Sequence, residues 1–109
     1  VLPISVFLVS LLSAPIQASE KIIIDADVGI DDAMAILFAI ASPEIELLGI
    51  TTTYGNATIE NSTKNANYLI ERTGKDIPVV QGASFPLVIP PDPPADFVHG
   101  DNGLGNVDV

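Results

Sequence analysis

Between residues 21 and 82, short apolar runs alternate with longer segments whose apolar residues recur at helical spacing. Continuous short apolar runs are typical of strands that are buried on both faces, whereas apolar residues three or four positions apart are typical of helices. The pattern therefore predicts two kinds of element in alternation. Strands are predicted at 21–25, 45–53 and 77–82, and helices at 31–42 and 58–74.

Residues suited to helix ends support both helix predictions. Asp31 and Asp32 place acidic side chains in the first turn of the first helix, which must end before Pro43. Thr58 is a suitable N-cap for the second helix, and Gly74 is a suitable C-cap. Strands and helices in strict alternation predict an α/β fold, with a parallel sheet, right-handed crossovers and flanking helices.

The amino-acid composition of the chain changes after Gly82. Residues 83–109 are rich in proline and glycine, which interrupt both periodicities and predict an irregular loop. A loop of this length within a compact domain is usually functional or disordered. The chain then stops within a glycine-rich stretch, so we expect residues 20–109 to be the N-terminal part of a domain that is truncated at its C-terminus.

The first 19 residues carry no charge, and their apolar stretch from Val6 to Leu12 is followed by small residues at Ala14 and Ala18. This arrangement is typical of a signal peptide cleaved after Ala18, although the basic residues that usually precede the apolar stretch are absent. Prolines interrupt the segment and leave it too short to span a membrane. We therefore expect residues 1–19 to be a signal peptide and the protein to be secreted, extracellular or periplasmic.

Charge and cysteine content narrow the function classes. With 14 acidic and 4 basic residues, the chain has a net charge of −10. This balance argues against nucleic acid or an anionic membrane as a partner, and it is compatible with a metal cation. The chain has no cysteine, which excludes thiolate metal sites and cysteine nucleophiles.

Much of the acidity is concentrated where the first strand meets the first helix. Asp25, Asp27, Asp31 and Asp32 surround Gly29 at the carboxyl end of the predicted strand, where ligands bind in parallel α/β sheets. Clustered carboxylates repel one another unless a cation lies among them. All-oxygen ligands predict a hard cation, Ca²⁺ or Mg²⁺ rather than Zn²⁺.

Three kinds of site compete for this cluster. An EF-hand calcium loop is disfavoured, because Gly29 occupies its fifth position and Ile36 its twelfth, where a glutamate is required. A phosphatase of the haloacid-dehalogenase type would use Asp25 as nucleophile, but it would have no use for the adjacent Asp31 and Asp32. The third possibility is a metal site that binds ribose.

Three blocks of the chain together resemble one family. "DADVGIDDAMAIL" (residues 25–37) resembles the N-terminal D-x-D-x-G-x-D-D signature of the inosine-uridine-preferring nucleoside hydrolases. "ELLGITTTYGN" (46–56) is similar to the second strand of that family with its terminal asparagine, and "HGDNGLG" (99–105) is similar to its H-G-x-x-G-x-G loop. The resemblance covers residues 20–106 and implies the α/β fold of that family.

The resemblance implies roles for the carboxylates. Asp27 and Asp32 are expected to be Ca²⁺ ligands, and Asp27 is also expected to take a proton from the attacking water. Asp25 matches the first aspartate of the signature, for which we expect a supporting role. The remaining protein ligands of the metal are expected beyond residue 109.

The resemblance also implies contacts to the substrate. Asp31 and Asn56 are expected to bind the ribose, and His99 is expected to lie on a mobile loop that closes over the nucleoside. Val28 stands where the family usually has proline, which should make the turn less rigid.

The implied function is calcium-dependent hydrolysis of the N-glycosidic bond of ribonucleosides, which serves nucleoside catabolism or salvage. The expected partner is a small-molecule nucleoside. We expect no binding to nucleic acid or membrane, and a homo-oligomer is possible. One alternative is a non-catalytic protein of the same fold that binds ribose or metal, and a less favoured one is the phosphatase.

Overall fold

The computed structural model describes residues 19–109, so the predicted signal peptide and its cleavage site lie outside the described residues. Within the described part of the chain, no helix combines the length and the apolar character needed to cross a membrane.

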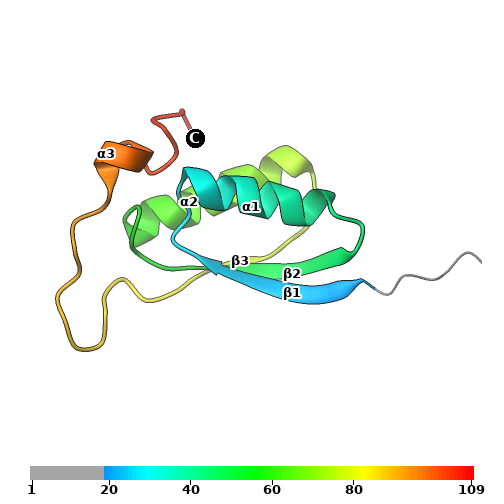
Figure 1. Cartoon of the computed structure of the whole chain (residues 1–109), viewed down its shortest axis with the longest axis horizontal. Helices are drawn as coiled ribbons and strands as arrows, with labels where there is room; N and C mark the ends of the chain where they lie inside the picture. The colour runs from blue at the N-terminus through cyan, green and yellow to red at the C-terminus, as the bar shows by residue number, and fades with distance from the viewer. Residues whose placement is uncertain (1–18) are drawn as a thin grey trace, which may run out of the picture.

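The described residues form a three-stranded sheet with two long helices (Figure 1). The three strands are parallel and follow one another in the order β1-β2-β3. The α/β alternation and the parallel sheet are therefore confirmed. The elements are β1 (Glu20–Ala26), α1 (Ile30–Ala41), β2 (Ile45–Thr52), α2 (Ile59–Thr73), β3 (Val79–Gln81) and α3 (Asp96–His99).

Both long helices lie over the same face of the sheet (Figure 1). This follows from the strand order, because right-handed crossovers that advance in one direction place their helices on one side. The core lies between the helices and that face. Its buried apolar side chains are Ala26, Val28, Ala33, Ile36, Ile50, Ala66, Leu69, Ile70 and Leu104.

The caps of α2 agree with the sequence. The Thr58 hydroxyl accepts a hydrogen bond from the Asn61 N–H at 3.2 Å, and Gly74 adopts a left-handed conformation with φ of 66°. Because glycine has no Cβ, this conformation carries little steric cost there. The caps predicted at both ends of this helix are therefore confirmed.

Two elements differ from the sequence-based prediction. Strand β3 begins at Val79 instead of residue 77, because Pro78 has no N–H to contribute to a parallel ladder. The region after Gly82 contains one short helix, α3, where only irregular structure was expected. Its single turn begins after the last proline of the segment, where backbone N–H groups are again available, and Ala95 O accepts from Val98 N–H and His99 N–H at 3.0 Å each.

Candidate functional site

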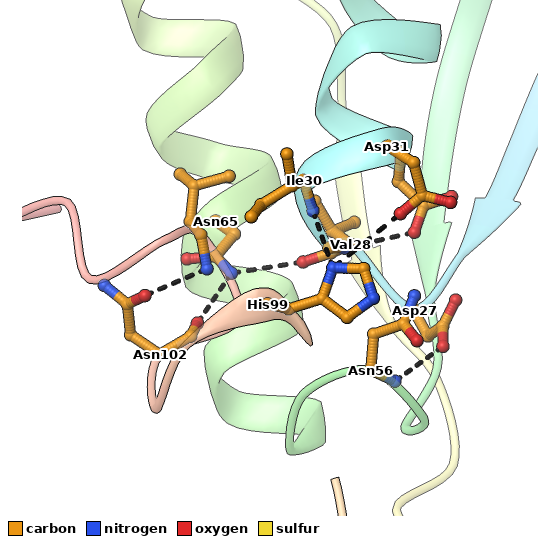
Figure 2. A network of polar contacts seen from close by, with 11 residues as sticks. Asp27, Val28, Ile30, Asp31, Asn56, Asn65, His99 and Asn102 are labelled. Atoms are coloured by element: carbon orange, nitrogen blue, oxygen red, sulfur yellow. Dashed lines mark hydrogen bonds and ion pairs between the residues drawn. The ribbon is translucent and has the colours of Figure 1, made fainter. Parts of the chain in front are cut away.

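The site forms where the chain leaves β1 and β2 at their carboxyl ends, and the chain returns to it from α3 (Figure 2). We call residues 27–32 the aspartate turn and residues 99–106 the His99 loop. The turn contains the start of α1, and the loop contains the end of α3. The two segments are brought together by the fold, since about 70 residues separate them along the chain.

Asp27 is fixed by the loop that follows β2. Its Oδ2 accepts a hydrogen bond from the Asn56 backbone N–H at 2.6 Å (Figure 2). Gly55 passes so close to the same carboxylate that a Cβ at this position would collide with it. The loop from β2 thus holds the orientation of a carboxylate at the end of β1.

Asp32 stands at the third position of α1 and caps its own helix. Its Oδ2 accepts from the backbone N–H of Gly29, the N-cap residue, at 3.0 Å. Burial raises the pKa of the Asp32 carboxyl above its ordinary value, and the negative charges of Asp27 and Asp31 raise it further. The Gly29 N–H and the Asn56 side chain oppose these effects in part.

His99 is buried and contacts the start of α1 directly. Its Nδ1 accepts a hydrogen bond from the Ile30 N–H at 3.2 Å, and the same atom lies 3.9 Å from Asp31 Oδ1 (Figure 2). Accepting a backbone proton at Nδ1 assigns the neutral tautomer that carries its proton on Nε2. The imidazole therefore accepts a hydrogen bond from one of the N–H groups that have no partner within the helix.

The contact with His99 requires glycine in the aspartate turn. A Cβ at Gly29 would lie 2.7 Å from His99 Nδ1 and 2.9 Å from its Cε1. The backbone of Gly29, with φ of −96° and ψ of −166°, is open to other residues. The constraint is therefore one of space, because only a residue without a side chain lets the imidazole approach.

Asp25 is separate from these contacts. It is exposed, and its Oδ1 accepts a hydrogen bond from the Thr51 hydroxyl of the neighbouring strand at 2.7 Å. The pairing of β1 with β2 places these two residues side by side. The supporting role expected for Asp25 stays a prediction.

The structure brings five of the six sequence-predicted site residues to one place, namely Asp27, Asp31, Asp32, Asn56 and His99. Over residues 19–109, however, no group of three or more His, Asp or Glu side chains is placed to hold a metal ion. The structure also reveals Asn65, a buried residue of α2 that contacts both segments of the site and that sequence reasoning missed. The sequence signal was a polar residue within the apolar stripe of α2.

Comparison with known proteins places this arrangement in one family. The sequence model described as "Inosine-uridine preferring nucleoside hydrolase" matches residues 22–109. The chain belongs to this family. It is 53% identical over 91 residues to uridine nucleosidase 1 of Arabidopsis thaliana. The match covers 83% of this chain and 27% of the relative.

Solved structures of the nucleoside hydrolase family share the fold. A plant nucleoside hydrolase, the PpNRh1 enzyme, matches with a TM-score of 0.75 and 50% identity over 80% of this chain and 28% of its own. A purine-preferring ribonucleoside hydrolase from Gardnerella vaginalis matches with a TM-score of 0.77 and 40% identity over 82% of this chain and 29% of its own. The chain thus spans less than a third of the length of these relatives.

Proposed function

We propose that the protein to which this chain belongs hydrolyses the N-glycosidic bond of ribonucleosides with Ca²⁺ as cofactor, releasing nucleobase and ribose for nucleoside catabolism. Membership in the nucleoside hydrolase family supports the reaction class. The observation that carries the proposal is the contact of His99 with the start of α1, because it assembles the matched sequence blocks into one site.

The reaction explains why the site is acidic. Breaking a glycosidic bond of a nucleoside passes through a ribosyl species with oxocarbenium character, which carries developing positive charge. Fixed carboxylates stabilise such charge without reorganisation. Asp27, Asp31 and Asp32 lie close enough for their charges to interact, so their negative potential falls on one small volume.

Asp27 is the residue best placed to activate water. The 2.6 Å hydrogen bond from Asn56 N–H holds Oδ2, which fixes the direction in which the other oxygen points. A carboxylate held in this way accepts a proton from a water molecule at a defined position, as general-base catalysis requires. We therefore assign the general base to Asp27.

Asp31, Asn56 and His99 are assigned to the substrate. Asp31 is exposed at the first turn of α1 and offers carboxylate oxygens to sugar hydroxyls. The neutral imidazole of His99 keeps a donor on Nε2, because Nδ1 is occupied by Ile30 N–H. Together these groups provide both acceptors and donors for a polyhydroxylated ligand.

The donor chemistry fits part of a calcium site. Asp27 and Asp32 offer carboxylate oxygens, and the pKa of Asp32 is raised first by burial and then by the nearby charges of Asp27 and Asp31, which a cation would neutralise. When bound, the ion would polarise the ribose hydroxyls and a water molecule. Residues 19–109 place no group of three or more His, Asp or Glu side chains for a metal ion, so in this proposal carbonyl oxygens, water, the substrate or residues outside this range complete the site.

The test is hydrolysis of inosine and uridine by the protein expressed from its full gene. The quantity measured is the release of free base. Asp27→Asn should lower kcat by roughly 10²–10⁴-fold, the usual contribution of a general base. Asp76→Asn, a matched change at an exposed position away from the site, should leave kcat unchanged. A calcium chelator should abolish the activity, and added Ca²⁺ should restore it.

Two results would overturn the proposal. Nucleoside binding without release of base, measured by calorimetry, would identify a non-catalytic binding protein. Transfer of phosphate to Asp25 from a phosphate ester would identify the phosphatase chemistry instead.

A further inference from the structure

Asn65 joins the two segments of the site from behind. It lies on α2, is fully buried, and donates hydrogen bonds to Val28 O at 3.1 Å and to Asn102 O at 2.9 Å (Figure 2). Val28 belongs to the aspartate turn, between Asp27 and Gly29, and Asn102 belongs to the His99 loop. A single side-chain amide therefore connects two backbone segments that are distant in sequence.

The chemistry of this contact depends on the amide NH₂ group. Both partners are carbonyl oxygens, so the nitrogen must face them, and both of its protons are used. Within the described residues, the Asn65 Oδ1 is buried without a hydrogen-bond partner. Burying an unpaired acceptor is unfavourable. The side chain is thus explained by its two donors and not by its fit to an apolar core.

Hydrogen bonds within the His99 loop connect His99 to Asn102. Asn102 Oδ1 accepts from Leu104 N–H at 2.9 Å and from Asn106 N–H at 3.0 Å, and Gly105 N–H donates to His99 O at 2.7 Å. These internal bonds connect His99 rigidly to Asn102, the residue that Asn65 holds. Displacing Asn102 would therefore displace the imidazole as well.

Close packing adds to this connection. Gly103 has φ of 80°, and a Cβ there would lie 2.6 Å from the Ala57 Cβ and 3.2 Å from Asn65 Nδ2. The loop backbone thus lies directly against α2 at the point where Asn65 donates.

We infer that Asn65 is a positioning residue, which holds the His99 loop against the aspartate turn and so sets the distance from His99 to Asp31 and Asp27. The catalytic consequence rests on the proposed function, whereas the structural one does not. The hydrogen bonds of Asn65 go to the carbonyls of Val28 and Asn102, and it acts on the carboxylates and the imidazole through them.

The structural consequence is tested by hydrogen exchange at the Ile30 amide, which donates to His99 only while the loop is docked. Asn65→Asp keeps the size of the side chain but removes both donors. In the protein expressed from its full gene, it should accelerate exchange of this amide by a factor of at least roughly 2 to 10, the effect of losing the one hydrogen bond that reaches the loop, to Asn102 O.

Asn67→Asp is the matched control. Asn67 is an exposed residue of the same helix, and its amide donates to Thr63 O within that helix at 2.9 Å. The same chemical change there should leave exchange at Ile30 unaltered. Asn65→Ser is the second variant. The serine hydroxyl carries one proton, so it can donate to at most one of the carbonyls of Val28 and Asn102, and exchange at Ile30 should again accelerate.

The catalytic consequence is tested by steady-state hydrolysis of inosine and uridine. Residues that orient groups of a site typically contribute roughly 10–100-fold in activity. Asn65→Asp should lower kcat and kcat/KM together by that factor, because the loss is one of alignment during the reaction. Asn67→Asp should leave both unchanged.

Unaltered exchange at Ile30 in a folded Asn65 variant would overturn the inference, even if the activity fell. Failure of both Asn65 variants to fold would also overturn it, since Asn65 would then be needed for the core itself. A wild-type protein that hydrolyses no nucleoside would refute only the proposed function, because the exchange measurement does not depend on turnover.

Discussion

At the scale of single residues, Asp32 carries a negative charge at a position where that charge is unfavourable for folding. Asp32 serves its helix, since its carboxylate accepts from the Gly29 N–H, yet it is partly buried next to Asp27 and Asp31. A capping role alone would be filled equally well by an uncharged acceptor. The cap therefore does not require the charge of Asp32, whereas the proposed cation site does.

Asp32→Asn should separate these two roles. Because folding raises the pKa of Asp32, the folded protein binds its proton more tightly than the unfolded chain does. The free energy of unfolding of metal-free protein must then fall as the pH rises above the ordinary pKa of about 4, and the loss persists at neutral pH. Asparagine does not ionise, so the variant should lose this part of the pH dependence while keeping the cap.

The measurement is urea unfolding at about pH 4 and pH 7 in the presence of a chelator, together with calcium titration by calorimetry. The variant should be more stable than the wild type at the higher pH and should bind Ca²⁺ more weakly. Asp76→Asn, at an exposed position, serves as the control. Unchanged calcium affinity would remove Asp32 from the ligand set.

At the scale of elements, the N-terminus of α1 is where the site is assembled. Its first turn supplies Asp31 and Asp32. The N–H of its N-cap Gly29 donates to the Asp32 carboxylate, and the N–H of its first residue, Ile30, donates to the His99 imidazole. An α-helix leaves its first four N–H groups without partners inside the helix. The His99 loop docks here because the helix terminus offers it a donor.

Gly29→Ala tests whether this docking depends on space. Alanine tolerates the backbone angles of Gly29, but its Cβ would lie 2.7 Å from His99 Nδ1, so the imidazole must move. The free energy of unfolding should fall by about 1–3 kcal/mol, the usual cost of forcing a packed side chain to shift. The value of kcat/KM should fall by up to roughly a hundredfold, the cost of displacing a group of the site by about 1 Å.

Gly49→Ala, in β2, is the control, because no atom would lie nearer than 3.4 Å to its new Cβ. Exchange of the Ile30 amide should accelerate in Gly29→Ala and stay unchanged in Gly49→Ala. Wild-type kinetics in a folded Gly29→Ala protein would show that the contact between His99 and Ile30 is dispensable.

At the scale of the whole molecule, the described residues leave large apolar surfaces bare. Ile23 of β1 and Val80 of β3 are 65% and 58% exposed, and Met34 and Phe38 of α1 are 70% and 69% exposed. Both helices cover one face of the sheet only, so the other face has no layer over it (Figure 1). Parallel sheets in α/β proteins are ordinarily covered on both faces.

A polypeptide of residues 19–109 alone should therefore self-associate, and Ile23→Lys should reduce that association. In the protein expressed from its full gene, the same substitution should be harmful. It should lower the free energy of unfolding by on the order of several kcal/mol, since burying an unpaired charge is costly. Asn67→Lys, on the exposed side of α2, is the control for added charge.

Sedimentation of the short polypeptide and thermal unfolding of the full-length protein measure the two effects. A short polypeptide that stays monomeric and unfolds cooperatively would show that these apolar surfaces need no cover.

Much of the fold was predictable because its information is local. Apolar periodicity placed all three strands and both long helices, and Thr58 and Gly74 predicted the caps of α2. Four of the six candidate site residues lie within eight positions of one another, so their proximity followed from a single strand-to-helix connection. The short helix α3 escaped prediction because one turn is too short to show a period.

The sequence by itself determined which residues are acidic at the end of β1 and that a helix begins directly behind them. Only the tertiary structure decided that His99 meets Ile30, that Asp25 turns to Thr51 instead, and that Asn65 holds turn and loop together. Periodicity reports which face of an element is buried, but not which distant segment lies against it. These contacts join residues 26 to 69 positions apart, and their geometry exists only once the helices have packed on the sheet.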